Sequence, residues 1–142
     1  MRKRIGTSLV VSLGLILAGC GSSRSGSGSW QATLTNPDGS TAYTFAATIA
    51  QNGNTLSFPS LFFTNPGSCS ALTLAGGSGT VGNGSTVIKI SSGLANPEAT
   101  ILKLNGSWNG NTSAGTWTLN GSVIPCNGNG TFMLFKKPAD TP

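Results

Sequence analysis

Histidine is absent from the 142-residue chain, and only three residues are acidic. General acid–base catalysis would therefore depend on Asp38, Glu98 or Asp140. We interpret all three as turn or surface residues, because the first lies in a Pro-Asp-Gly turn, the second follows Asn-Pro and the third lies in the terminal tail. A glycosidase needs two carboxylates in one cleft, and a serine triad needs a base. The spacing leaves a Ser-Lys dyad with Lys89 or Lys103 open, but no motif supports one, and we predict that the protein is not an enzyme.

Charged residues make up only 8% of the chain, against about 25% in typical soluble domains. Three of the eight basic residues, Arg2, Lys3 and Arg4, stand at the very start. The rest of the chain holds five basic and three acidic residues, a net charge of +2, and no basic cluster that could contact phosphates. Calcium loops need clustered carboxylates, which are missing. We therefore expect no nucleic-acid partner, no metal and no cofactor.

Long apolar runs are missing too, apart from one stretch in residues 1–19. There the basic start is followed by an apolar segment over residues 5–17 and then by the small residues Ala18 and Gly19. This order is typical of a secretory signal peptide. A membrane-spanning helix needs about 20 apolar residues, so a cleaved leader is favoured over a retained anchor helix.

Leu17-Ala18-Gly19-Cys20 resembles the lipobox of bacterial lipoproteins. The resemblance implies cleavage between Gly19 and Cys20, followed by acylation of Cys20 on its sulfur and on its new amino group. Two or more acyl chains hold a protein stably on a bilayer. The next residue is Gly21 rather than Asp, which in lipoproteins of double-membraned bacteria favours the outer membrane. We expect a cell-envelope protein whose partner is the membrane, bound through this lipid anchor.

The other two of the three cysteines are Cys69 and Cys126. In an oxidising compartment outside the cytoplasm, such an even pair favours a disulfide, and two separate buried thiols are the alternative. A bridge that closes a loop of this length would stabilise the fold by about 4 kcal/mol in the chain-entropy model.

Residues 20–29 contain the lipidation site and a Gly/Ser-rich segment, GSSRSGSGS, whose composition predicts a flexible tether. From Trp30 onward, apolar and polar residues alternate, as in WQATLT, AYTFAATIA, STVIKI, TILKLN, GTWTL and GTFMLF. Alternation with Thr and aromatic enrichment indicates half-buried antiparallel strands, and no helical stripe is present. We predict an all-β domain over residues 30–137, followed by a tail over residues 138–142.

Asn-Gly pairs recur between these segments and favour tight hairpin turns. The predicted strands span residues 30–35, 42–50, 55–63, 69–74, 80–82, 85–91, 100–108 and 115–122, with a last strand at 130–136 that closes against the first. Short successive connections predict a small antiparallel up-and-down barrel of about eight strands, and a two-sheet β-sandwich is the alternative.

A Gly-Ser/Thr-aromatic motif recurs at Gly28-Ser29-Trp30, Gly106-Ser107-Trp108, Gly115-Thr116-Trp117 and Gly130-Thr131-Phe132. We expect the aromatic residue to point inward and to fill the end of a barrel. The alternative is an aromatic-lined ligand mouth formed by Trp30, Trp108 and Trp117, since pockets are commonly lined by such side chains. Core packing is favoured, because no polar group is aimed at the same place.

This spacing, with Cys126-Asn-Gly-Asn-Gly-Thr-Phe132 near the end, resembles small β-barrel domains of uncharacterised bacterial lipoproteins. It is more distantly similar to the lipocalin and avidin type of barrel, whose first strand also opens with Gly-x-Trp. The distant likeness would imply carriage of a small apolar ligand, but lipocalins also have a helix after their strands, and none is expected here.

An eight-stranded barrel can be filled by its own side chains. The inward candidates are bulky enough to do so: Trp30, Tyr43, Phe45, Ile49, Trp108, Trp117, Phe132 and Leu134. We therefore predict a non-catalytic structural, accessory or protein-interaction domain of the envelope, and the alternative is a carrier of a small apolar ligand.

Overall fold

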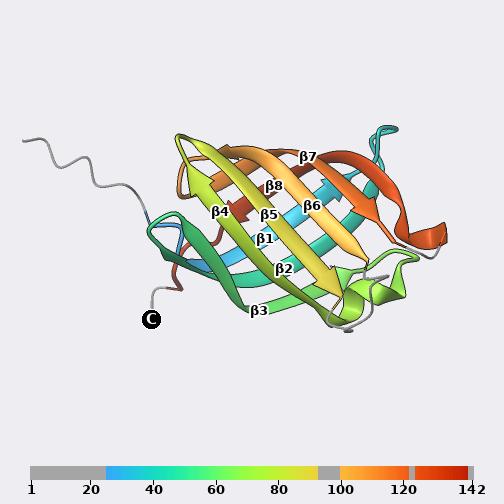
Figure 1. Ribbon diagram of the computed structural model, residues 1–142, viewed down its shortest axis with the longest axis horizontal. Coiled ribbons are helices and arrows are strands. Elements are labelled where there is room, and N and C mark those ends of the chain that lie inside the picture. Colours follow the sequence, from blue (N-terminus) through green and yellow to red (C-terminus); the bar gives the residue numbers. More distant parts are fainter. Residues whose placement is uncertain (1–24, 93–99, 122–123, 141–142) are drawn as a thin grey trace, which may run out of the picture.

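The computed structural model describes residues 25–92, 100–121 and 124–140. The predicted signal peptide, the cleavage site at Gly19 and the lipidation site at Cys20 lie outside these residues. The described chain forms a closed barrel of eight antiparallel strands, in which each strand pairs with its neighbours in chain order and β8 returns to β1 (Figure 1). The predicted up-and-down barrel is confirmed, and the sandwich alternative is wrong.

The eight strands and two short 3-10 helices follow one another in this order: β1 (Gly28–Thr35), β2 (Thr41–Asn52), β3 (Thr55–Asn65), η1 (Ser70–Leu74), β4 (Ala75–Gly82), β5 (Ser85–Ser92), β6 (Ile101–Trp108), β7 (Thr112–Asn120), η2 (Ile124–Cys126) and β8 (Gly128–Lys136).

The prediction of a strand at residues 69–74 is wrong, because this segment forms η1 and the strand follows it as β4. Glycine is rare in strands, and for this reason we predicted no strand over the glycine-rich start of β4. Close packing requires it there: a Cβ on Gly77 would lie 2.8 Å from the Phe58 ring, and one on Gly79 would lie 2.9 Å from the carbonyl oxygen of Val87.

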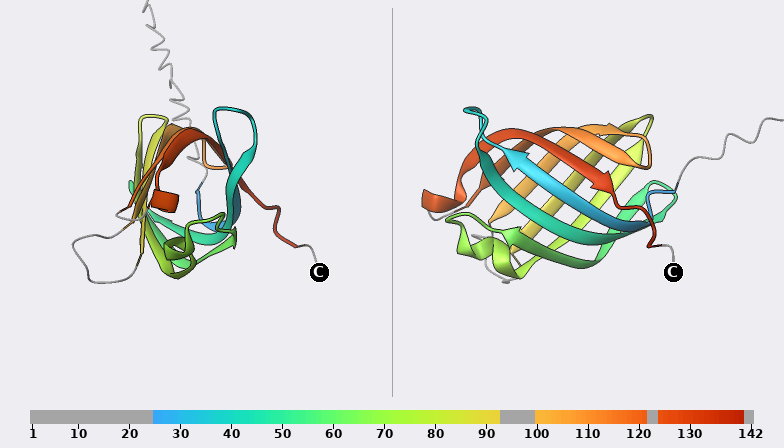
Figure 2. Two further views of the ribbon diagram at one scale, coloured as in Figure 1. Left: turned by 90° about the vertical axis from the view of Figure 1, so that its right-hand side faces the viewer. Right: turned by 180° about the vertical axis from the view of Figure 1, so that it is seen from behind.

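The two ends of the barrel differ in their connections. Tight hairpins join β2 to β3, β4 to β5 and β6 to β7 at one end, where β1 also begins, and we call it the tether end (Figure 2). The β4–β5 turn, Asn83-Gly84, has φ angles of 51° and 73°, as the predicted Asn-Gly hairpins require. The long connections, with η1 and η2, lie at the opposite end, which we call the disulfide end (Figure 2).

Apolar side chains fill the inside of the barrel, and the intervening side chains face outward. Most strands alternate between buried and outward residues, most clearly β5, where every second residue is buried. In β3, whose pairing with β2 has register shifts, only Leu56 is buried. The largest fully buried side chains come from β1 to β3, η1 and β5 to β7: Trp30, Trp117, Phe45, Leu34, Ile49, Leu56, Leu72, Ile88, Ile90, Leu102, Leu104 and Leu119. The outward positions carry mainly Thr, Ser, Asn and Lys.

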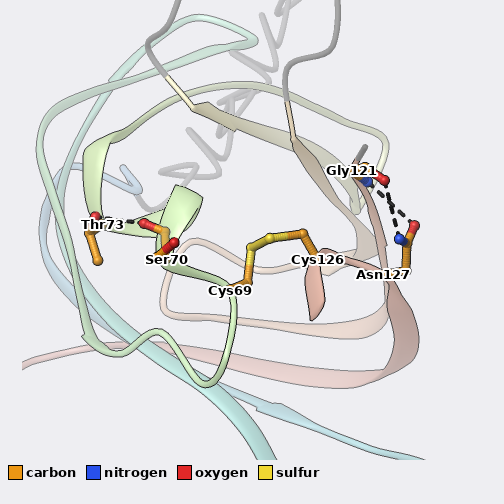
Figure 3. Close-up of a disulfide and its surroundings, with 6 residues drawn as sticks. All are labelled: Cys69, Ser70, Thr73, Gly121, Cys126 and Asn127. Atoms are coloured by element: carbon orange, nitrogen blue, oxygen red, sulfur yellow. Dashed lines mark hydrogen bonds between the residues drawn. A yellow bond between two sulfur atoms is a disulfide. The ribbon is translucent and has the colours of Figure 1, made fainter. Parts of the chain in front are cut away.

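Cys69 and Cys126 form a disulfide, with their Cα atoms 4.8 Å apart (Figure 3). The predicted pairing is confirmed, and the alternative of two separate thiols is wrong. The bridge joins the β3–β4 connection to the β7–β8 connection across the disulfide end. Asn127 braces the second of these, because its side-chain amide donates to the carbonyl oxygen of Gly121 at 3.1 Å.

Candidate functional site

The three tryptophans that were candidates for one ligand mouth lie at opposite ends of the barrel. Gly106 of β6 pairs directly with Gly115 of β7. From these two glycines the antiparallel strands run in opposite directions, so Trp108 lies toward the tether end and Trp117 toward the disulfide end. Trp117 pairs with Leu104 of β6, which lies four residues before Trp108, so the two tryptophans are separated by about 13 Å along the strand direction.

Each end has its own aromatic cluster. At the tether end, the Trp30 and Trp108 rings stack with their centroids 5.0 Å apart. At the disulfide end, Trp117 meets Tyr43 edge to face at 5.5 Å, and its indole N–H donates to the carbonyl oxygen of Thr35 at 3.0 Å. Trp30 and Trp117 are each only 1% exposed, so both serve as core residues.

Residues 25–27 pack on the tether end before β1 begins, beside a hollow of about 260 Å³ that Gln51 and Trp108 line. Gly26 is buried there: its N–H donates to Oε1 of Gln51 at 2.6 Å, and its carbonyl oxygen accepts the Trp30 indole N–H at 2.6 Å. The N–H of Gln51 in turn donates to Oγ of Ser27 at 2.9 Å. A Cβ on Gly26 would overlap the Trp108 ring, so only glycine fits at this position.

This arrangement corrects the predicted extent of the tether, since residues 25–29 belong to the folded barrel rather than to a flexible linker. The Gly/Ser composition gave no sign of it, because the same residues suit a loose coil and a segment pressed against an aromatic ring. The decisive contacts come from Gln51 and Trp108, which are distant in the sequence.

The bulky inward candidates fill the barrel. Seven of them are 6% exposed or less, namely Trp30, Tyr43, Phe45, Ile49, Trp117, Phe132 and Leu134, and Trp108 is half-buried at the tether end. Among the described residues, Ser113 Oγ is the buried side-chain polar atom without a hydrogen-bond partner. A single hydroxyl does not amount to the converging polar groups that orient a small ligand.

The two described carboxylates do not share a cleft, as a catalytic pair would: Asp140 lines a groove on the outer surface, and Asp38 does not line it. Asp38 is exposed and accepts hydrogen bonds from the hydroxyl and the N–H of Ser40, which lower the pKa of its carboxyl group. Asp140 is exposed in the terminal segment. Lys89 lies between Ser78 of β4 and Lys103 of β6 in the strand pairing, and within the described chain neither lysine is hydrogen-bonded to a serine.

No group of three or more His, Cys, Asp or Glu side chains in the described part of the chain is placed to hold a metal ion. Within residues 25–92, 100–121 and 124–140, no helix is long and apolar enough to cross a membrane.

The outer surface of the described chain carries large apolar side chains at positions where alternation predicts polar ones. Of the four large apolar side chains that are exposed in the described chain, Met133 (59%) and Phe135 (39%) lie on β8, and Phe62 (55%) lies on β3, with β1 and β2 between them. Phe135 pairs with Gln31, Gln31 with Ala46, and Ala46 with Phe62, so one cross-strand row connects β8 to β3. We call the outer face of β3, β2, β1 and β8 the β8 wall.

Two hollows lie on this wall. A groove of about 620 Å³ extends between the terminal segment and the outer faces of β1 to β3, and Phe62, Lys136 and Lys137 line it. A second hollow of about 550 Å³ lies beside Met133 and Phe135. The sequence did contain a signal for this region, because Phe132-Met-Leu-Phe135 is apolar at both the inward and the outward positions of the strand.

The barrel thus has an interior filled by its own side chains and, on its outer surface, exposed apolar side chains beside two hollows. Comparisons of the chain with family models, curated proteins and solved structures found no match.

Proposed function

We propose that this chain is a lipid-anchored protein of the bacterial cell envelope that acts through its outer surface, as a structural, accessory or protein-interaction domain, and not by catalysis. The observation that carries this proposal is the filled interior of the barrel. Side chains such as Phe45, Leu104 and Leu134 are fully buried, so the space in which a carrier would hold its ligand is occupied.

The anchor is proposed from the sequence and is consistent with the fold. The lipobox places the acylated residue at Cys20, and the barrel begins at residue 25, so the lipid would hold the domain through a short linker. The Cys69–Cys126 disulfide is compatible with an oxidising compartment outside the cytoplasm. The glycine after Cys20 favours the outer membrane as the site of anchoring.

The absence of catalysis is proposed from the chemistry of the described side chains. Asp38 is engaged by Ser40 within its own turn. Lys89 faces Ser78 across β4 and β5, but no hydrogen bond joins the two side chains, and its other cross-strand neighbour is a second cation, Lys103. Acid–base or nucleophilic catalysis would require a general base whose pKa lies near neutral pH.

Metabolic labelling with a palmitate analogue tests the anchor. The full-length chain, expressed in a double-membraned bacterium, should yield a labelled and shortened product, and Cys20→Ser should yield an unlabelled product that retains its leader. Gly21→Asp should keep the label but shift the protein to the inner-membrane fraction. An unlabelled wild-type product would refute the anchor.

Native mass spectrometry of the labelled product, released from its envelope in mild detergent, tests the filled interior. We expect the mass of the acylated chain alone. A small apolar molecule bound in a one-to-one ratio would favour the carrier function instead.

A further inference from the structure

Apolar and charged side chains follow one another in a fixed order along the outer face of β8. Met133 and Phe135 occupy successive outward positions of β8, and Lys137 is the next outward residue. The N–H of Lys137 donates to the carbonyl oxygen of Ser29 at 2.8 Å, so the strand pairing continues to this point. Two apolar side chains are thus followed by a cation as the strand approaches the tether end.

Fixed contacts limit how far the barrel can move from an anchor at Cys20. Residue 25 is held at the tether end, because the carbonyl oxygen of Ser25 accepts a hydrogen bond from Nζ of Lys136 at 3.1 Å and the next residue is buried. Five peptide units separate Cys20 from Ser25, which span at most about 18 Å when fully extended. A flexible linker of this length has a typical span of about 12 Å.

These distances are short compared with the barrel itself, since an eight-residue strand is about 26 Å long. A domain on such a linker remains in contact with the membrane surface for much of the time. The face that it presents is then decided by the side chains close to the tether end.

The β8 wall has the side chains that suit a lipid surface. Exposed apolar residues insert into the boundary between headgroups and acyl chains, while a neighbouring lysine keeps its ammonium group among the phosphates. Phe135 and Lys137 lie close to the tether end, and Phe62 shares a groove with Lys136 and Lys137. Lysines near an anionic surface are attracted to it.

The other side of the barrel lacks this combination. Around the closed barrel, β5 is four strands away from β1. Its outer face carries Lys89, which pairs with Lys103, and a single exposed apolar residue, Val87. Charge alone would attract this side to anionic lipid, but it has little apolar surface to insert.

We propose that the β8 wall rests on the surface of the membrane that carries the anchor, with Met133, Phe135 and Phe62 among the lipid headgroups and Lys137 beside their phosphates. This inference rests on the proposed lipid anchor, and it adds the orientation of the barrel and the lipid bilayer as the partner of one specific wall. The opposite wall, on β5 and β6, remains available to other envelope components.

Met133 provides a selective probe of this contact. The chain has two methionines, and removal of the leader takes away Met1, so a ¹³C-methyl-methionine label reports from the β8 wall alone. The lipidated full-length product would be placed in nanodiscs of phosphatidylethanolamine and phosphatidylglycerol that contain a lipid with a paramagnetic headgroup. We expect strong broadening of the single methyl signal relative to diamagnetic discs.

The matched control moves the same probe to the opposite wall. In the double variant M133L/V87M, the β8 wall stays apolar and the only methionine of the mature chain lies on β5. We expect broadening there to be several-fold weaker than at Met133 in the wild type. A second variant, Phe135→Ser with Lys137→Gln, keeps Met133 as the probe and should reduce its broadening.

Equal broadening of the two probes would mean that the barrel presents no preferred face, and stronger broadening on β5 would mean that the other wall faces the lipid. Either result overturns the inference and leaves the β8 wall to a protein partner. Failure of the protein to stay on the discs, or a second methionine signal from an uncut leader, would instead refute the anchor and the inference together.

Discussion

Replacing Gly26 by alanine tests whether the segment over residues 25–27 is part of the folded barrel. The glycine lies against the Trp108 ring, and a methyl group in its place would overlap that ring. The segment has two ways to respond. Either Trp108 moves out of its stack with Trp30, or residues 25–27 lift off the tether end and lose their hydrogen bonds to Gln51 and Trp30.

Both responses lead to a similar loss of stability. Forcing an extra methyl group into a packed site destabilises by about 1–3 kcal/mol. Lifting the segment breaks the two hydrogen bonds of Gly26, each worth about 1 kcal/mol. We therefore expect Gly26→Ala to lower the free energy of unfolding by about 2 kcal/mol, which corresponds to a fall in Tm of roughly 10 °C for a domain of this size.

Thermal unfolding of the purified mature protein, followed by near-ultraviolet circular dichroism, measures this effect and reports on the tryptophan stack at the same time. Gly76→Ala is the matched control, because no atom lies within 4 Å of the added methyl group and the backbone there is extended. We expect the control to stay within about 1 kcal/mol of the wild type. If Gly26→Ala is as stable as Gly76→Ala, residues 25–27 do not pack on the barrel as described.

Three further predictions concern the rest of the described chain. Reduction of the Cys69–Cys126 disulfide should lower the free energy of unfolding in urea by up to about 4 kcal/mol, and an unchanged midpoint would contradict the bridge. Trp117→Phe should destabilise by about 2 kcal/mol in the same assay, because it leaves a cavity and a β1 carbonyl oxygen without its donor, and an effect below about 0.5 kcal/mol would argue against this burial. The carboxyl pKa of Asp38, followed by NMR titration, should lie below 3.8, because Ser40 hydrogen-bonds to the ionised carboxylate, and Ser40→Ala should raise this pKa. The hydrogen bond therefore stabilises the fold at pH values above 3.8, and this stabilisation is lost as the pH falls through the pKa of the folded state.

The sequence by itself determined the fold class. Alternation in segments such as AYTFAATIA and STVIKI requires one buried and one exposed face, and the Asn-Gly turns between strands leave room only for antiparallel neighbours. The identity of the disulfide followed from counting, because lipidation of Cys20 would leave a single pair. These features are local or compositional, and therefore they can be recognised without knowing where each strand lies.

Tertiary structure alone decided which residues meet. The pairing of Gly106 with Gly115 sends Trp108 and Trp117 to opposite ends, although both stand in the same short motif. The role of Gly26 depends on a ring that is distant in the chain, and the β8 wall depends on a register that aligns Phe62 with Phe135 across three strand pairings. Register is a property of the closed sheet as a whole, because each strand must satisfy both neighbours at once, and no single segment of the sequence contains that information.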